Sequence, residues 1–177
     1  MRYNMKRRHH TTHYLFTVLI FLFLSILPVC NKQEPASLPT ALLKPDSPLY
    51  LVTRVIDGDT IVLEEGIKVR YIGIDTPETK HPKKPVQYFG KEASEANKQL
   101  VSGKKVRLEY DVQKTDKYGR TLAYVYLEDG TFVNAWLVEN GFARVSTYPP
   151  NVKYQNLFLE SEQKAREKEK GLWINLK

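Results

Sequence analysis

The chain has 177 residues, of which 42% are hydrophobic and 11% aromatic. This composition suits one folded domain with additional segments, and it excludes a wholly disordered chain, which could not bury enough apolar surface to fold. The formal net charge is +7, but the first 30 residues hold four basic side chains and no acid, so the remainder carries +3. This modest excess is compatible with a polyanionic partner and equally with ordinary solubility.

The first 30 residues carry a targeting pattern. Four basic side chains between positions 2 and 8 precede an uncharged apolar run at 15–29. The run is shorter than the roughly 20 residues that cross a bilayer as a helix. A basic segment before a short apolar core predicts a secretory signal peptide over residues 1–30, with an uncleaved membrane anchor as the alternative.

Cys30 ends this apolar run and is the only cysteine of the sequence, so no intrachain disulfide can form. The segment Leu27-Pro28-Val29-Cys30 resembles the lipobox of bacterial lipoproteins, although a small residue is usual where Val29 stands. Membrane attachment through a lipidated Cys30 and an incidental thiol both remain open. The leader therefore predicts export across the inner membrane of a bacterium, followed by secretion or by anchoring as a lipoprotein.

A short tether is predicted between this leader and the folded domain. Residues 31–48 contain four prolines and little periodicity, so the domain is expected to cover residues 49–177. Its first part consists of segments rich in β-branched residues, separated by short turns, which is typical of an antiparallel meander. The predicted strands are 51–56, 60–64 and 67–74.

The rest of the domain is expected to contain three helices and two more strands. Apolar residues recur at helical spacing in three segments, and two others have the pattern of strands. The helices are predicted at 93–101, 133–140 and 152–170, and the strands at 105–110 and 122–127. Five strands and three helices in this order favour an α+β fold, mainly β, built on a small Greek-key barrel.

Two acidic turns at strand ends are the first candidates for chemistry. One contains Asp57 and Asp59, and the other contains Asp75, Thr76 and Glu78. A hard cation such as Ca²⁺ needs several oxygen ligands, which Asp59 and Asp75 can supply together with a backbone carbonyl and water. Asp57 is predicted to cap its own turn behind them. The alternative is that all three are ordinary turn aspartates.

Two arginines suit a phosphate ligand. Arg70 lies in a largely apolar strand, where an unpaired charge is costly, and Arg120 closes the polar turn 115–120. Guanidinium groups bind phosphate in bidentate fashion and neutralise charge that develops on phosphorus. A salt bridge to an aspartate is the alternative for Arg70, and a solvated hairpin residue is the alternative for Arg120. Glu78 can orient or deprotonate an attacking water.

Several segments together resemble one enzyme family. The segments VIDGDT, VRYIGIDTPETKHPKK, GKEAS and TDKYGRTLAYVY, and a tail helix ending in GLW, are similar to those of the thermonuclease (staphylococcal nuclease-like) family. The resemblance covers residues 49–174 and implies a five-stranded OB-fold barrel with three helices. It also implies Ca²⁺-dependent endonuclease and exonuclease activity on single- and double-stranded DNA and on RNA, leaving 3′-phosphate ends. We expect a monomer without a protein partner.

The resemblance also implies roles for individual residues. The catalytic positions that it implies are Arg70, Glu78 and Arg120. The calcium ligands that it implies are Asp59, Asp75 and the backbone carbonyl of Thr76, with Asp57 beside the metal site.

Substrate contacts follow from the same resemblance. Lys117 and Tyr118 fall in a turn that lies near the nucleotide's phosphate in the family. Staphylococcal nuclease has two tyrosines after its second helix that cradle the base and sugar, whereas this chain reads Ser-Thr-Tyr-Pro-Pro at 146–150. At most Tyr148 keeps that role. The hairpin at 64–66 is also shorter than in staphylococcal nuclease.

The alternative function is that of a non-catalytic OB-fold module that binds nucleic acid, because a fold does not fix a function. Relatives without nuclease activity are expected to lack the carboxylates or the arginines. This chain keeps them all, which favours the nuclease.

Overall fold

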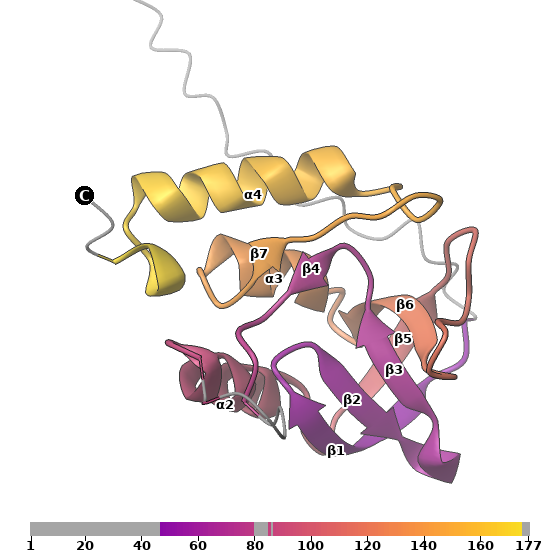
Figure 1. The fold of residues 1–177 in the computed structure, drawn as a ribbon. Helices are drawn as coiled ribbons and strands as arrows, with labels where there is room; N and C mark the ends of the chain where they lie inside the picture. Colours follow the sequence, from indigo (N-terminus) through magenta and orange to yellow (C-terminus); the bar gives the residue numbers. More distant parts are fainter. Residues whose placement is uncertain (1–46, 80–84, 86, 175–177) are drawn as a thin grey trace, which may run out of the picture. The chain divides into compact units, whose positions relative to one another are not determined.

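A five-stranded barrel forms the centre of the computed structural model, which describes residues 47–79, 85 and 87–174. The strands close in the order β1-β2-β3-β6-β5 (Figure 1). They are β1 (Tyr50–Asp57), β2 (Thr60–Leu63), β3 (Lys68–Tyr71), β5 (Lys105–Glu109) and β6 (Thr121–Leu127). The prediction of an α+β OB-fold barrel with three helices is confirmed.

The first three strands form the predicted antiparallel meander. Strand β1 pairs with β2, and β2 pairs with β3 through partners such as Thr60 and Arg70. All four residues of β2 are buried, so this strand is covered on both faces. The connection from β2 to β3 is a short 3₁₀ turn, η1 (Glu64–Gly66), whose residues Glu65 and Gly66 have φ of 64° and 78°. The tip of the hairpin therefore lies at residues 64–66, as predicted.

The predicted strand at 67–74 is wrong in one respect, because the chain leaves the barrel after β3. Gly73 has φ of 80°, in the left-handed region that favours glycine, and a Cβ there would lie 2.5 Å from the ring of Phe158. After this turn, β4 (Ile74–Asp75) pairs with β7 (Arg144–Val145) in a separate two-stranded sheet. The continuous apolar run concealed this break.

Parallel pairing between β3 and β6 closes the barrel. Val69, Arg70 and Tyr71 lie opposite Thr121, Leu122 and Ala123. Strand β6 also pairs antiparallel with β5, and β5 pairs antiparallel with the start of β1. The segment that carries Arg70 is thereby placed beside the segment that follows Arg120.

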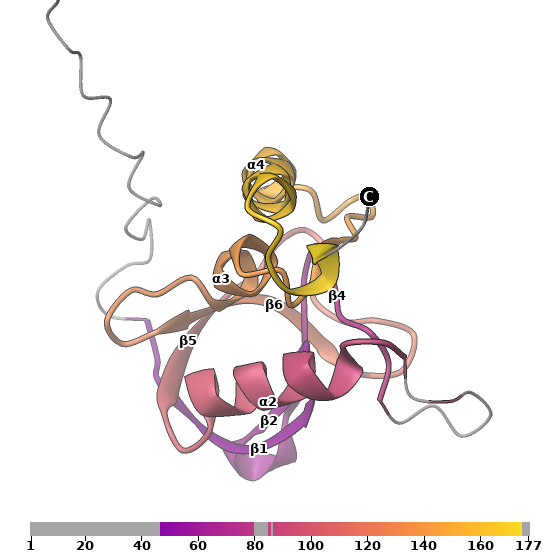
Figure 2. The ribbon, with the colours of Figure 1, turned by 90° about the vertical axis from the view of Figure 1, so that its left-hand side faces the viewer.

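In the part of the chain that the structure describes, three α-helices pack on the barrel or on one another. Helix α2 (Gly90–Val101) lies across one end of it (Figure 2). Helix α3 (Val133–Glu139) lies between the barrel and α4 (Gln155–Glu167) in both views. The predicted helix 152–170 is too long at both ends, because Asn151 is tied into the preceding loop and Glu169 has φ of 47°. Helix α3 agrees with its predicted range to within one residue, whereas α2 begins at Gly90, three residues before its predicted start.

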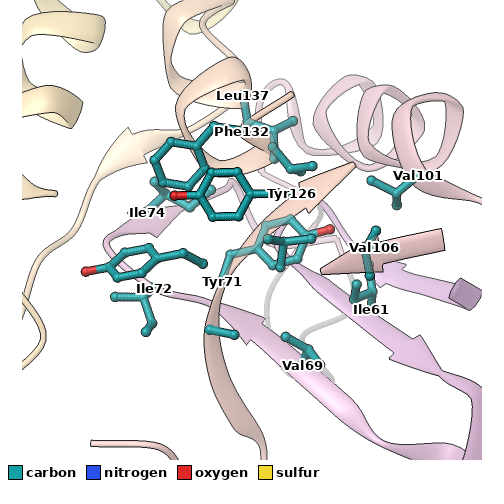
Figure 3. Packing of buried hydrophobic residues seen from close by; sticks show 14 of the residues in the cluster. Ile61, Val69, Tyr71, Ile72, Ile74, Val101, Val106, Tyr126, Phe132 and Leu137 are labelled. Atoms are coloured by element: carbon teal, nitrogen blue, oxygen red, sulfur yellow. The ribbon is translucent and has the colours of Figure 1, made fainter. Parts of the chain in front are cut away.

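The main core fills the barrel and continues beneath α3 and α4. Tyr71, Ile61, Val69 and Val106 are buried inside the barrel, and Phe132 lies between it and the helices (Figure 3). Burial of such side chains contributes about 1.5–3 kcal/mol each. A smaller cluster contains Ala165, Leu172 and Trp173, with Phe89 against it, so the segment after α4 packs back against this helix.

Several predictions concern residues outside the described part of the chain. The leader 1–30 with Cys30 and nearly all of the tether 31–48 are among them. Within the described ranges, none of the helices has both the length and the apolar character needed to cross a membrane. The division into leader, tether and domain stays a prediction.

Candidate active site

Asp59 joins the two acidic turns. Its buried carboxylate accepts hydrogen bonds at Oδ2 from the backbone N of Thr76 (2.8 Å) and from Thr76 Oγ1 (2.9 Å). The other oxygen, Oδ1, accepts a hydrogen bond from Thr60 Oγ1 at 3.0 Å. Hydrogen bonds to an ionised carboxylate are strong, and they offset the cost of burying its charge. Residues 17 positions apart are therefore held in direct contact.

Close approach of these turns depends on Gly58. A Cβ at this position would lie 2.7 Å from Thr76 Oγ1 and 2.8 Å from Thr76 Cβ, closer than such atoms are found. Any larger residue would therefore push the turn away from Thr76. The need for glycine here is set by packing against the second turn.

Asp57 caps its own turn, as predicted. Its Oδ1 accepts hydrogen bonds from the backbone N of Gly58 at 2.8 Å and from Thr79 Oγ1 at 3.1 Å. Burial raises the pKa of Asp57 to about 6, and the negative charges of Asp59 and Glu78 act in the same direction. The two hydrogen bonds oppose this increase without cancelling it.

Arg70 connects both predicted metal ligands. Its Nη1 lies 3.1 Å from Asp59 Oδ2, and its Nη2 donates to Asp75 Oδ1 at 2.8 Å. Nη1 also donates to the backbone carbonyls of Tyr71 at 3.2 Å and Ile74 at 2.9 Å. The salt bridge expected as the alternative for Arg70 is therefore present, and it is made to two aspartates. Only 16% of the Arg70 side chain is exposed, so its orientation is well fixed.

The surroundings of these carboxylates favour a cation. Burial raises the pKa of Asp75, and the charges of Asp59 and Glu78 raise it too, against the opposing effect of Arg70 and Arg144. Four carboxylates thus act on one another around one arginine that forms ion pairs with two of them. A bound cation would relieve this repulsion.

The available ligands suit calcium by their chemistry. Asp59 and Asp75 offer carboxylate oxygens, and Thr76 offers a backbone carbonyl, all of which are hard donors. Among the residues that the structure describes, no group of three or more His, Cys, Asp or Glu side chains is gathered closely enough to hold a metal. Water would therefore have to supply the remaining ligands, as is common for calcium.

Glu78 is held through its backbone by Gln87, a residue that sequence reasoning missed. The backbone N of Glu78 donates to Gln87 Oε1 at 2.9 Å, and the backbone N of Gln87 donates to the carbonyl of Glu78 at 3.0 Å. The charge of Glu78 acts on both Asp57 and Asp75. This reciprocal pair fixes the segment that carries the predicted water-activating carboxylate.

Arg120 is positioned by Asp116, which the sequence analysis also missed. Arg120 Nε donates to Asp116 Oδ2 at 2.7 Å, and the backbone N atoms of Arg120 and Tyr118 donate to Asp116 Oδ1 at 3.0 and 2.9 Å. Burial would raise the pKa of Asp116, but these donors hold it below its ordinary value. An aspartate at the start of a turn that ends in glycine was the available signal.

The predicted substrate residues line one cleft of about 530 Å³, called the main cleft below. It is lined by Arg70, Lys117, Tyr118, Arg120 and Tyr148, with other residues. The side chains of Tyr118 and Tyr148 are widely open to solvent, as their exposed fractions of 72% and 74% show. The guanidinium of Arg120 lies 5.4 Å and the ammonium of Lys117 5.1 Å from the centre of the Tyr118 ring.

The ten predicted site residues thus form two groups that meet at Arg70. The first group lies in the acidic turns and does not line the main cleft; it consists of Asp57, Asp59, Asp75, Thr76 and Glu78. Arg70 contacts Asp59 and Asp75 and also lines the cleft. A phosphate bound in the main cleft at Arg70 would therefore lie next to the candidate metal ligands.

Comparison with known proteins identifies the family. The model of the staphylococcal nuclease homologues matches residues 68–175. A thermonuclease of Staphylococcus intermedius is 50% identical over 127 residues, which are 70% of this chain and 75% of that protein. The chain belongs to the staphylococcal nuclease family. A second family relative, a thermonuclease of Staphylococcus hyicus, is 42% identical over 168 residues, covering 93% of this chain and 98% of that protein.

A protein from a second bacterial genus is similar to this chain as well. Endonuclease YncB of Bacillus subtilis (strain 168) is 49% identical over 125 residues, which are 68% of this chain and 59% of that protein. The match to the staphylococcal nuclease family model begins at the first residue of β3, so Asp57 and Asp59 precede it. Arg70, Asp75, Glu78 and Arg120 lie within it. Family membership, first indicated by short motifs, is confirmed.

Proposed function

We propose that this protein is a calcium-dependent nuclease that hydrolyses phosphodiester bonds in single- and double-stranded DNA and in RNA, leaving 3′-phosphate ends. The observation that carries the proposal is the double position of Arg70, which pairs with Asp59 and Asp75 and also lines the main cleft with Arg120. Relatives named thermonuclease and endonuclease support it.

Calcium binding is assigned to the acidic turns. Asp59, Asp75 and the backbone carbonyl of Thr76 would hold the ion, while Asp57 stays behind them as the cap of its turn. When bound, the ion supplies positive charge that polarises the scissile phosphate. The carboxylate repulsion and the hard oxygen donors described above support this assignment.

The arginines are assigned to the phosphate. Arg70 and Arg120 would donate to its non-bridging oxygens, and their charge stabilises the additional negative charge that develops at phosphorus. Each is oriented by a carboxylate, Arg70 by Asp75 and Arg120 by Asp116. Such fixed donors need little reorganisation during the reaction.

Glu78 is assigned to the attacking water. Its carboxylate orients the water and accepts its proton. The oxygen of the water bonds to phosphorus, the bond from phosphorus to the 5′ oxygen of the next nucleotide breaks, and that oxygen takes a proton from solvent water as it leaves. The products are a 3′-phosphate and a 5′-hydroxyl end.

Lys117, Tyr118 and Tyr148 are assigned to the nucleotide. Lys117 would contact phosphate, and the exposed rings of Tyr118 and Tyr148 provide surfaces on which bases can stack. Stacking tolerates every base, in agreement with a substrate range that includes DNA and RNA. A monomer is sufficient for this function, because all the assigned residues come from one chain.

Export is part of the same proposal. Residues 1–30 would direct the chain across the inner membrane, and residues 31–48 would link them to the nuclease domain. Cleavage before Cys30, with lipidation of its thiol, would leave the enzyme anchored to a membrane, whereas cleavage without lipidation would release it. The mass of the mature N-terminus distinguishes these outcomes.

A digestion assay tests the nuclease. Residues 31–177 should degrade single-stranded DNA in millimolar Ca²⁺ and stop when chelator is in excess. Glu78→Gln and Arg120→Ala should both lose most of the activity. A protein that binds DNA but never cuts it would instead be the non-catalytic OB-fold module, and persistent cutting in chelator would rule out the role of calcium.

A further inference from the structure

A second cavity, called the side pocket below, lies next to the acidic turns. It has a volume of about 230 Å³ and is lined by Asp75, Thr76, Pro77, Gln87, Tyr88 and Arg144. It shares no lining residue with the main cleft. Ile74 lines the main cleft and Asp75 lines the side pocket, and neighbouring residues of a strand point to opposite faces. Strand β4 therefore separates the two cavities.

The candidate cleavage centre lies between these cavities. Arg70 lines the main cleft and donates a hydrogen bond to Asp75, which lines the side pocket. A polynucleotide is cut within a strand, so nucleotides continue on both sides of the scissile phosphate. The main cleft can hold the nucleotide on one side of the scissile phosphate, and the side pocket is then available for the nucleotide on the other side.

The chemistry of the side pocket suits a nucleotide. Tyr88 exposes 70% of its surface, which makes its ring available for stacking, and Arg144 supplies a cation. The amide of Gln87 adds hydrogen-bonding capacity. An aromatic ring beside a cation is the usual combination in proteins that bind single strands without sequence preference. It also repeats the pairing of Tyr118 with Arg120 and Lys117 in the main cleft.

The backbone around Tyr88 is fixed before any ligand binds. Gln87, which precedes it, is hydrogen-bonded to Glu78, and Phe89, which follows it, has φ of 65°. This left-handed conformation is costly for a bulky residue and persists only where the surroundings determine it. The Phe89 ring is stacked on Phe142 with 5.7 Å between ring centres. A pre-formed platform costs less entropy on binding.

Arg144 is held from the opposite side. In the sheet of β4 and β7, the backbone of Arg144 lies opposite that of Asp75. The guanidinium of Arg144 lies 5.6 Å from the centre of the Trp173 ring. The same ring has the guanidinium of Arg166 at 3.6 Å. The C-terminal segment therefore supports the cation of the side pocket, although it lies far from the acidic turns in the sequence.

We propose that the side pocket is a second polynucleotide subsite, in which a base stacks on Tyr88 and a backbone phosphate binds Arg144. It accepts the nucleotide on the side of the scissile phosphate opposite to the one held in the main cleft. This inference rests on the proposed nuclease function. It predicts that a strand long enough to reach both cavities binds more tightly than a dinucleotide.

Binding can be tested without cleavage in the full-length Glu78→Gln protein, purified in mild detergent. Fluorescence anisotropy with Ca²⁺ would compare labelled oligothymidylate of about 12 nucleotides, within the range of sites on OB folds, with a labelled dinucleotide. Tyr88→Ala and Arg144→Gln should each weaken binding of the long strand about tenfold, and should reduce the ratio of long-strand to dinucleotide affinity.

Two control variants match these changes. Tyr110→Ala removes an exposed tyrosine that lines neither cavity, and Arg54→Gln removes one exposed positive charge from β1. Both should keep the affinity ratio of the Glu78→Gln protein. If Arg54→Gln reduces the ratio as much as Arg144→Gln does, the effect is general electrostatics and the subsite is wrong. Circular dichroism and Tm verify that each variant is folded.

Failure of the subsite differs from failure of the nuclease. Cleavage by the wild-type protein, together with an unchanged affinity ratio in Tyr88→Ala and Arg144→Gln, would overturn the subsite alone. Absence of cleavage by the wild-type protein, together with loss of long-strand affinity in both variants, would overturn the nuclease while supporting the side pocket as a binding site.

Discussion

The hydroxyl of Tyr71 donates a 3.0 Å hydrogen bond to Oδ1 of Asn97, and both side chains are buried. Asn97 Nδ2 donates in turn to the carbonyl of Asp57 at 3.0 Å, while the backbone N of Tyr71 donates to the carbonyl of Asp59 at 3.0 Å. Burial holds the pKa of Tyr71 well above its ordinary value, so the hydroxyl remains a donor. The residue after Arg70 thereby holds both ends of the first acidic turn.

Removing one partner of this hydrogen bond should be costly. Asn97→Leu leaves the Tyr71 hydroxyl and the Asp57 carbonyl without Asn97, and Tyr71→Phe leaves Asn97 Oδ1 without its donor, each at about 1–3 kcal/mol. The double variant should be less destabilised than the two single effects added together. Urea unfolding measures all three. Gln99→Leu, on the exposed face of α2, is the control, and strict additivity would show that the residues act independently.

Gly58→Ala should separate the acidic turns. The new methyl group would overlap Thr76, which costs about 1–3 kcal/mol and moves the carboxylate of Asp59 away from the second turn. The calcium concentration that gives half-maximal nuclease activity should therefore rise. Gly66→Ala is a matched control, because it strains a left-handed glycine that has no neighbour within 4 Å of the new Cβ. An equal calcium requirement in both variants would contradict this account.

Asp116 should stabilise the protein in a pH-dependent way. Its folded-state pKa is below the ordinary value of 3.8, so its contribution is fully present above about pH 3.8 and is lost as the pH falls through the lower folded value. The difference in unfolding free energy between the wild type and Asp116→Asn should therefore be constant near neutral pH and should shrink below 3.8. Chemical unfolding at a series of pH values measures it, and a difference that persists in acid would refute this origin.

Arg120 should matter for turnover more than for substrate affinity. Arg120→Ala removes a charge that is most useful when negative charge develops at phosphorus, so kcat should fall by about a hundredfold or more with a smaller change in KM. Arg120→Lys should restore little, because an ammonium group cannot reproduce the bidentate geometry. Steady-state kinetics on single-stranded DNA measure both constants. Full recovery in the lysine variant would indicate that only charge is required.

Calcium should stabilise the folded protein independently of catalysis. A ligand that binds only the folded state raises the free energy of unfolding, by about 2.7 kcal/mol when its concentration is a hundred times its Kd. The Tm rises as a result. Asp59→Asn and Asp75→Asn should abolish most of this increase. Asp129→Asn alters an aspartate in a distant turn and should keep it. Thermal unfolding with and without Ca²⁺ measures the increase in Tm. If Asp59→Asn and Asp75→Asn both keep this increase, the ion binds elsewhere.

Local patterns predicted the elements of this fold because most of them have one buried face. The β-branched residues of 51–56 and 60–64, with short turns between them, indicated the first strands, and the helical spacing of 93–101 follows the face of α2 that packs inward. The break at Gly73 escaped prediction, because its cause is the ring of Phe158, a residue far along the chain. Nor does any local pattern encode parallel pairing between β3 and β6.

Residue types and motifs in the sequence indicated which residues belong to the candidate site, but they did not indicate most of the contacts between these residues. Carboxylates and arginines at strand ends indicated metal and phosphate chemistry, but nothing in the spacing showed that Arg70 pairs with Asp59 and Asp75 together. Gln87 and Asp116 escaped notice because their roles consist of holding other residues. Such roles depend on distances that form only after folding.

The parallel pairing of β3 with β6 also determines at which stage of folding the candidate site with Arg70 and Arg120 can form. Arg70 and Leu122 are neighbours across the last seam of the barrel, and the 51 residues between them include α2 and β5. An incompletely synthesised or unfolded chain cannot bring Arg70 and Arg120 into one cleft. Barrel closure and the assembly of the candidate phosphate site are thus one event, so the two arginines of the proposed nuclease come together only in a chain that has closed its barrel.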